Sequence, residues 1–211
     1  MQLTASRGPG RPPAAKADET RNRIVLAARQ VFSERGYDGA TFQEIAVRAD
    51  LTRPAINHYF SNKRLLYSEV VDRTNELVVM TGIDRARRET TLMGRMAAFI
   101  AVAMEADIQN PSTAAFLATA VLESQRHPEL RRAETDSVRI SREFLTWAVE
   151  DAIKRGEIAP ETDVSTMAET LLVVLCGVGF YAGFIGSYEE IETITTLLGQ
   201  LIGGRLWQRP V

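Results

Sequence analysis

The sequence predicts an all-α protein of about nine helices, in which a three-helix N-terminal domain with a helix-turn-helix precedes a larger helical domain. The first observation is the spacing of Phe42, Ile45, Ala46 and Ala49, which fall at i, i+3, i+4 and i+7 on one helix face. The second is that apolar residues keep this spacing in one segment after another, from residue 92 to residue 201. The composition, 45% hydrophobic and 25% charged, is that of a soluble globular protein.

Several classes of function are disfavoured by residue counts and by missing motifs. One cysteine, Cys176, and two histidines leave no disulfide framework and no Cys/His metal site. The sequence shows no Gly-rich phosphate loop, nucleophile elbow or metal-spaced acidic cluster, so a helical enzyme is the weaker alternative and no metal or cofactor is expected. The polar N-terminus has no apolar signal-peptide core, which favours a cytoplasmic location.

Charge is distributed unevenly along the chain, although the net charge is only −2. Residues 1–74 carry four more basic than acidic side chains, and residues 75–211 carry six more acidic than basic. A basic N-terminal third indicates a polyanionic partner at that end of the molecule.

Residues 1–17 are rich in proline and glycine and contain Arg7, Arg11 and Lys16. No core can form from such a segment, so we expect a flexible basic arm. Gly10-Arg11-Pro12 resembles the core of an AT-hook, in which an arginine enters the narrow minor groove of A·T-rich DNA. A solvated tail without a DNA contact is the alternative for this arm.

Residues 18–66 carry the signals of the helix-turn-helix. A helix from Thr20 to about Arg35 ends at Gly36. Thr41 and Glu44 form a capping box at the start of the next helix. Asp50 tolerates the left-handed backbone of a tight turn. Thr52 caps a second short helix, in whose first turn Pro54 costs no hydrogen bond.

The polar face of this second short helix suits the edges of DNA bases. Arg53 and Asn57 lie one turn apart beside His58. Arginine matches guanine O6 and N7, and asparagine matches adenine N6 and N7. The alternative is an ordinary helical hairpin with a solvated face.

A longer helix follows, capped by Ser61 or Asn62 and burying Leu66, Val70 and Leu77. Lys63 stands in its first turn, where a cation opposes the helix dipole. A phosphate contact would explain that position.

The rest of the chain, residues 67–211, reads as further helices. We expect helices over Leu92–Ile108, Thr113–Arg126 and from Pro128 to about Arg155. Thr170–Gly186 is the most apolar stretch, shorter than a comfortable membrane span of about 20 residues. It is therefore predicted as a helix buried on all sides, without membrane contact. Ser187 and Glu190 open a last helix as a capping box.

The first part of this chain resembles the DNA-binding domain of the tetracycline-repressor (TetR) family. The matching positions are Ile24, Ala27, Ala28, Phe32, Gly36, Tyr37, Thr41, Ile45, Ala46, Ala49, Tyr59, Phe60, Lys63 and Leu66. The resemblance implies a homodimeric, ligand-released transcriptional repressor that binds palindromic operator DNA. The residues expected at the DNA are Thr41, Thr52, Arg53, Pro54, Asn57, His58, Tyr59 and Lys63, with Arg11 of the arm.

Two positions depart from the family pattern. Asp50 stands where the family usually has glycine, and Asn57 stands where it usually has a phosphate-contacting tyrosine. Asn57 is therefore a candidate for reading a base instead.

The resemblance places the dimer interface on the last two long helices, and the sequence offers two very apolar helices there. The residues predicted at the interface are Leu175, Gly179, Gly183, Ile194, Leu198 and Leu201. A glycine pair four residues apart, Gly179 and Gly183, would allow another helix to approach closely. The alternative is that these residues form the internal core.

A ligand-released repressor also needs a pocket, for which the candidates are apolar residues with few polar interruptions. These are Met96, Phe99, Met104, Phe116, Thr119, Glu123, Phe144, Trp147 and Phe180. Such a lining suits a hydrophobic or amphipathic small molecule. The alternative is a constitutive DNA-binding regulator, in which the same residues form a solid core.

Overall fold

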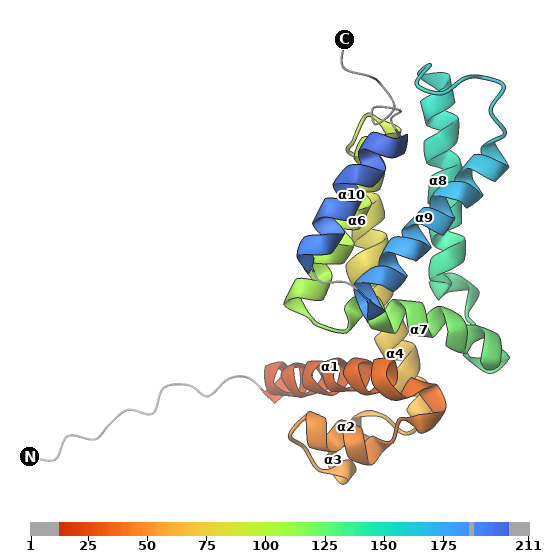
Figure 1. The fold of residues 1–211 in the computed structure, drawn as a ribbon. Helices are drawn as coiled ribbons and strands as arrows, with labels where there is room; N and C mark the ends of the chain where they lie inside the picture. The colour runs from red at the N-terminus through yellow and green to blue at the C-terminus, as the bar shows by residue number, and fades with distance from the viewer. Residues whose placement is uncertain (1–12, 186–187, 203–211) are drawn as a thin grey trace, which may run out of the picture.

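The computed structural model describes residues 13–185 and 188–202, which form helices joined by turns and loops and contain no strand (Figure 1). The α-helices are α1 (Pro13–Gly39), α2 (Phe42–Arg48), α3 (Arg53–Tyr59), α4 (Lys63–Asn75), α5 (Thr81–Ala86), α6 (Leu92–Gln109), α7 (Thr113–Arg126), α8 (Ser137–Lys154), α9 (Val164–Phe184) and α10 (Tyr188–Ile202). A π-helical turn, η1 (Glu76–Met80), joins α4 to α5, and two 3-10 turns, η2 (Pro128–Leu130) and η3 (Ala133–Thr135), precede α8. The all-α fold predicted from the sequence is confirmed.

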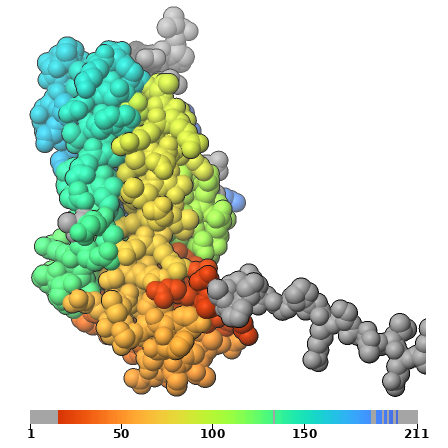
Figure 2. All heavy atoms as spheres, turned by 180° about the vertical axis from the view of Figure 1, so that it is seen from behind, coloured from red at the N-terminus to blue at the C-terminus, as the bar shows by residue number. Residues whose placement is uncertain are grey.

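The helices form two packed groups. Helices α1, α2 and α3 lie together at one end, and α6, α8, α9 and α10 lie at the other (Figure 1). Helix α4 leads from one group to the other, and α7 lies across α1 between them. Seen from behind, the orange helix-turn-helix residues form one end of an elongated molecule (Figure 2).

The first helix begins earlier than the sequence suggested. Helix α1 starts at Pro13, so residues 13–17 belong to it and not to the predicted arm. Proline fits the first turn of a helix, and the run Ala14-Ala15-Lys16-Ala17 that follows has high helix propensity. Arg11 and the rest of the arm lie outside the described residues.

The helix-turn-helix signals are confirmed. The Thr41 hydroxyl accepts from the Glu44 N–H at 3.2 Å, and the Glu44 carboxylate accepts from the Thr41 N–H at 3.3 Å. Asp50 has a φ of 51°, as the tight turn requires. The Thr52 hydroxyl accepts from the Ala55 N–H at 3.3 Å. Gly36, with a φ of 68°, breaks the end of α1.

The π-helical turn after α4 changes which residues are buried. We expected Leu77 on the buried face, whereas Leu77 is half-buried, and Val78 and Val79 are each only 3% exposed. A π turn holds one residue more than an α turn, so it rotates the following side chains around the helix axis. Val79 consequently belongs to the second core.

The segment after α7 also differs from expectation. Pro128 opens only the 3-10 turn η2, and the long helix α8 begins at Ser137. Asp136 is its cap, because the Asp136 carboxylate accepts from the Arg139 N–H at 3.0 Å. Proline allows a helix start, but the capping carboxylate determines where this one begins.

Two hydrophobic cores hold the molecule together. The first contains buried residues of α1 to α4 and is completed by Phe116 of α7, which is fully buried. The second contains residues of η1, α5, α6, α8 and α9. The domain boundary predicted after residue 66 therefore falls inside α4, whose Tyr67 and Val70 still belong to the first core.

Helix α9 is much less buried than predicted. It is the one helix among the described residues that is long and apolar enough to cross a membrane, and 17% of its most apolar window is buried. One side packs on α7 and α8. The other side exposes Val173 and Phe184, so the prediction of a helix buried on all sides is wrong for the single chain.

Candidate functional site

The turn of the helix-turn-helix is held in place from α1. The Arg23 guanidinium donates to the carbonyl oxygens of Ala49 and Asp50, the latter at 3.1 Å. Its side chain also lies 3.9 Å from the Asp50 carboxylate. Helix α1 thus fixes the angle at which α3 leaves the turn.

Helix α3 presents a polar face to solvent. Thr52, Arg53, Pro54, Asn57 and His58 are all exposed. Neither the Arg53 guanidinium nor the Asn57 amide has a hydrogen-bond partner in the described part of the chain. Both groups are therefore accessible from solvent, and their contact with base edges stays a prediction.

The inner side of α3 is anchored in the first core. Ile56 is fully buried and Phe60 is 3% exposed. Tyr59 is half-buried, and its ring meets the edge of the His58 ring with centroids 5.3 Å apart. Thr41, at the start of α2, is exposed like the α3 residues that are predicted to contact DNA bases.

Lys63 has partners within the chain. Its ammonium donates to the carbonyl oxygens of Asp38 and Ala40 at 3.1 and 3.2 Å, and it lies 4.6 Å from the centre of the Tyr37 ring. These contacts explain a cation at the start of α4 without a phosphate. The phosphate contact of Lys63 stays a prediction.

An ion-pair cluster joins α1 to α4 next to the end of α3. The Arg21 guanidinium donates to Glu69 through Nε at 2.7 Å, and Arg73 lies 2.7 Å from the same carboxylate. Hydrogen bonding from Arg21 lowers the pKa of Glu69. Arg21 also covers the Phe60 ring at 4.6 Å, so it supports the end of α3.

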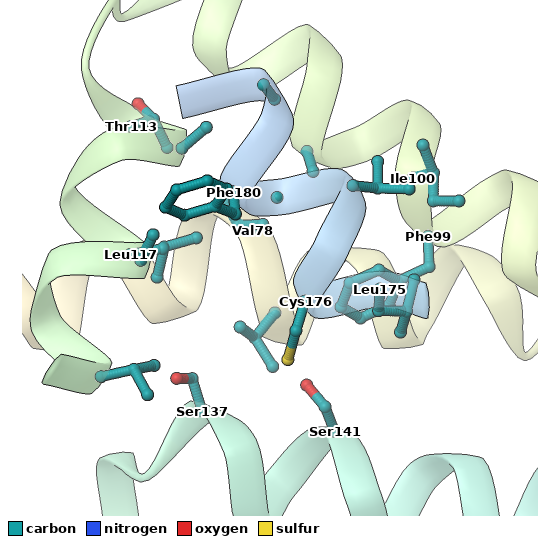
Figure 3. A pocket seen from close by; sticks show the side chains of 18 of the residues that line it. Val78, Phe99, Ile100, Thr113, Leu117, Ser137, Ser141, Leu175, Cys176 and Phe180 are labelled. Atoms are coloured by element: carbon teal, nitrogen blue, oxygen red, sulfur yellow. The ribbon is translucent and has the colours of Figure 1, made fainter. Parts of the chain in front are cut away.

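A cavity of about 370 Å³ lies in the larger domain, among η1, α6, α7, α8, α9 and α10 (Figure 3). Its wall is mostly aliphatic and aromatic, with Val78, Leu117, Leu175 and Phe180 among its residues. The polar exceptions are Asp107, Thr113, Ser137, Ser141 and Cys176. This volume falls in the range of small-molecule sites.

Three of the nine predicted pocket residues line this cavity: Phe99, Met104 and Phe180. The other six do not, and they have other roles. Met96 and Phe144 are packed in the second core, and the Trp147 ring lies outside it, 36% exposed, with the Arg95 guanidinium 4.5 Å from its centre. Phe116, Thr119 and Glu123 lie on α7 but do not line the cavity.

Two faces of helix α7 contact different parts of the molecule. Its residues Ala114, Leu117, Ala118 and Val121 line the cavity. Phe116 instead belongs to the first core, where its ring lies 5.8 Å from that of Tyr67 on α4. The same helix therefore touches both the cavity and the DNA-binding domain.

The C-terminal end of α7 contacts the segment that leads into α2. Glu123 is 4% exposed and packs against Gly36, where an added Cβ would lie 2.7 Å from its Oε1. His127 Nε2 lies 3.2 Å from the Asp38 carboxylate and 3.4 Å from that of Glu123. Lys63 of α4 also donates to the Asp38 carbonyl, so the last residues of α1 are held by both α7 and α4.

Several of the residues predicted at a dimer interface face other parts of the same chain. A Cβ added to Gly183 would lie 2.7 Å from Ala115 Cα, so the close helix approach at Gly183 is to α7 of the same chain. Leu175 and Gly179 line the cavity. Ile194 is half-buried, and the side chains of Leu198 and Leu201 lie outside the described residues.

The apolar surface of α9 is formed by other residues. Val173 and Phe184 are 69% and 49% exposed, and Leu197 of α10 is 47% exposed. Gly177 lies on the same side, with open space where a Cβ would stand. The periodicity of α9 identified an apolar helix, but only packing against α7 shows which side stays uncovered.

The fold and these two sites define a class: a helix-turn-helix DNA-binding protein with a cavity in its helical second domain. Comparison with models of protein families identifies the family to which this chain belongs. Residues 24–70 match the model for bacterial regulatory proteins of the tetR family, and residues 89–182 match the tetracyclin repressor-like C-terminal domain. The chain belongs to the TetR family of transcriptional regulators and is not an enzyme.

Named relatives include a regulator and an activator. The chain is 27% identical to the HTH-type transcriptional regulator SrpR of Pseudomonas putida, over 90% of this chain and 86% of SrpR. It is 40% identical to the HTH-type transcriptional activator FasR of Mycolicibacterium smegmatis. That match covers 35% of this chain and only 33% of FasR.

Solved structures share the fold. A TetR regulator from Chloroflexus aurantiacus is 24% identical, with a TM-score of 0.72 over 90% of this chain and 96% of that one. AibR, solved in complex with isovaleryl coenzyme A and operator DNA, is 19% identical, with a TM-score of 0.66 over 86% of this chain and 97% of that one.

Proposed function

We propose that this protein is a ligand-responsive repressor that binds palindromic operator DNA as a homodimer and is released by a hydrophobic or amphipathic molecule. The observation that carries the ligand response is the double contact of α7. One face of this helix lines the cavity, and Phe116 on another face is part of the core of the DNA-binding domain. A molecule in the cavity therefore acts on a helix that is packed against the DNA-binding domain.

Release follows from linkage between the two sites. Some conformations place the two α3 helices of the dimer wrongly for the operator. A ligand that prefers such a conformation weakens DNA binding by the same factor by which DNA weakens ligand binding. The contacts of Glu123 and His127 with the segment before α2 give a shift of α7 a direct route to the helix-turn-helix.

A second route runs from the cavity to α1. Asp107 lines the cavity, and its carboxylate accepts from the Ala114 N–H at 3.0 Å. Arg29 of α1 is 5% exposed, and its burial lowers the pKa of the guanidinium, an effect that the charge of Asp107 opposes. A ligand that displaces Asp107 therefore changes the surroundings of a buried cation in the DNA-binding domain.

The homodimer is supported by the uncovered side of α9. An apolar surface around Val173 and Phe184 is costly to leave in water, and a second copy of the same surface would cover it. Such a dimer presents two copies of α3, as a palindromic operator requires. This covering also accounts for the apolar helix without a membrane, in keeping with a cytoplasmic protein.

The effector class is supported by the cavity wall, which is apolar with few hydrogen-bonding groups. AibR, which shares the fold, was solved with an acyl coenzyme A, whose acyl part is also apolar. The constitutive alternative predicts a solid core in the larger domain, and the cavity disfavours it.

Repression is proposed over activation. A reporter gene placed behind the operator distinguishes the two directions of control. Deleting the regulator should raise expression of a repressed reporter, whereas it should lower expression of an activated one.

The direct test of the ligand response is a displacement titration. An operator obtained by sequence selection is labelled, bound by the protein and titrated with a panel of hydrophobic and polar compounds while fluorescence anisotropy reports release. We expect release by hydrophobic or amphipathic compounds only. If a polar metabolite released the operator and no hydrophobic compound did so, the proposed effector class would be wrong.

A further inference from the structure

Two hydroxyl groups in the cavity wall lack the partners that helical hydroxyls have elsewhere in this chain. Thr119, Thr146 and Thr170 each donate to the carbonyl oxygen four residues back, at 2.8 to 2.9 Å. The hydroxyls of Ser137 and Ser141 have no hydrogen-bond partner within the described residues. Ser141 is only 7% exposed, whereas Ser137 is half-buried.

Both hydroxyls face the cavity together with a thiol. Ser137 and Ser141 stand one turn apart on α8, and Cys176 lies opposite them on α9 (Figure 3). All three residues line the cavity, and their oxygen and sulfur atoms point into the space between the two helices (Figure 3). Hydroxyls without a protein partner in an otherwise apolar wall are the groups with which an occupant of the cavity can form hydrogen bonds.

The cluster is electrically neutral. Cys176 is exposed at its residue surface, but partial desolvation raises the pKa of its thiol, which keeps it protonated at neutral pH. Arg142, the nearby cation, is paired with Glu169. Among the described residues, Asp107 is the one charged residue in the cavity wall, and its carboxylate caps α7.

We propose that Ser137, Ser141 and Cys176 form the polar anchor of the effector site and recognise one uncharged oxygen-bearing group on an otherwise apolar molecule. This inference rests on the proposed function of the cavity as the effector site. A hydroxyl donates to a carbonyl oxygen of an ester, thioester or amide, and it also accepts from an alcohol. A free carboxylate or ammonium group would be desolvated beside the cluster without an opposite charge.

The test uses four probes with the same apolar chain: methyl octanoate, octanol, octanoate and octylamine. Isothermal titration calorimetry at neutral pH compares their affinities for the wild-type chain and for Ser141→Ala. Ser124→Ala is the matched control, because the Ser124 hydroxyl donates to the Val121 carbonyl at 2.7 Å and does not line the cavity.

We expect the two uncharged probes to bind at least tenfold more tightly than octanoate and octylamine. Ser141→Ala should weaken methyl octanoate about fivefold, the change expected for loss of one neutral hydrogen bond, and Ser124→Ala should leave it unchanged. Tighter binding of octanoate, or equal affinity of methyl octanoate for Ser141→Ala and the wild type, would overturn the anchor while leaving an apolar effector site in place. Failure of all four probes to bind would overturn the effector site and the anchor together.

Discussion

Arg53 is predicted to determine much of the operator specificity, and its surroundings make the prediction quantitative. The side chain is exposed and has no hydrogen-bond partner in the described part of the chain. Arg53→Ala should therefore change the free energy of unfolding by no more than about 0.5 kcal/mol. If Arg53→Ala changes the free energy of operator binding by more than this, the difference comes from a lost contact with DNA and not from lost stability.

The size of that effect follows from the dimer. A bidentate contact of arginine with guanine contributes about 1–3 kcal/mol of discrimination. Two half-sites double this to about 2–6 kcal/mol, and because 1.4 kcal/mol is a tenfold change in Kd, affinity for the selected operator should fall at least roughly thirtyfold. Binding to unrelated DNA should fall far less.

The assay combines sequence selection with anisotropy titrations at fixed salt concentration, since phosphate contacts depend strongly on salt. Arg88→Ala is the control, because it removes one exposed positive charge from the end of α5, far along the chain from α3. If Arg53→Ala selected the same operator with the same stringency as the wild type, α3 would not read bases through Arg53.

Three further predictions concern the rest of the structure. Glu69→Gln should lower the free energy of unfolding at pH 7, because hydrogen bonding from Arg21 lowers the pKa of Glu69 in the folded state. In denaturant titrations the loss should shrink as the pH falls below about 4.3, where Glu69 of the unfolded wild type takes up a proton, and should vanish at lower pH once the folded carboxylate is protonated too. Gly177→Glu should give folded monomers by light scattering, because its Cβ would point into open space on the uncovered side of α9, whereas Gly183→Glu should unfold or distort the subunit itself; a dimeric Gly177→Glu would move the interface elsewhere. Phe116→Ala should cost about 3–5 kcal/mol in thermal or chemical unfolding, since this ring is fully buried between the two domains, and a loss under about 1 kcal/mol would contradict its place in the first core.

The local features of the fold could be predicted from the sequence. The capping box of Thr41 and Glu44, the left-handed Asp50 and the cap at Thr52 depend on residues within one turn of each other. The boundaries of α7 were predicted correctly because a proline-containing stop precedes it and its apolar pattern is continuous.

Tertiary features were predicted less well. Six of the nine pocket candidates do not line the cavity, because helical spacing identifies an apolar residue but not the helix that it faces. Gly183 was correctly expected at a close helix contact, yet the contacting helix is α7 of the same chain. The π-helical turn after α4, which buries Val78 in place of Leu77, has no signal in local propensity.

The most direct test of ligand control is to fill the cavity with a side chain. Gly179 lines the cavity, and a Cβ added there would have no atom within 4 Å, so Gly179→Leu should fold normally and occupy part of the space. The measurement is operator affinity with and without a saturating hydrophobic effector, for the wild type and for Gly179→Leu. We expect the effector to release the operator from the wild type, and to bind Gly179→Leu weakly and leave its operator complex intact. Equal release from both proteins, or operator affinity unchanged when effector saturates the wild-type cavity, would contradict control of DNA binding through this cavity.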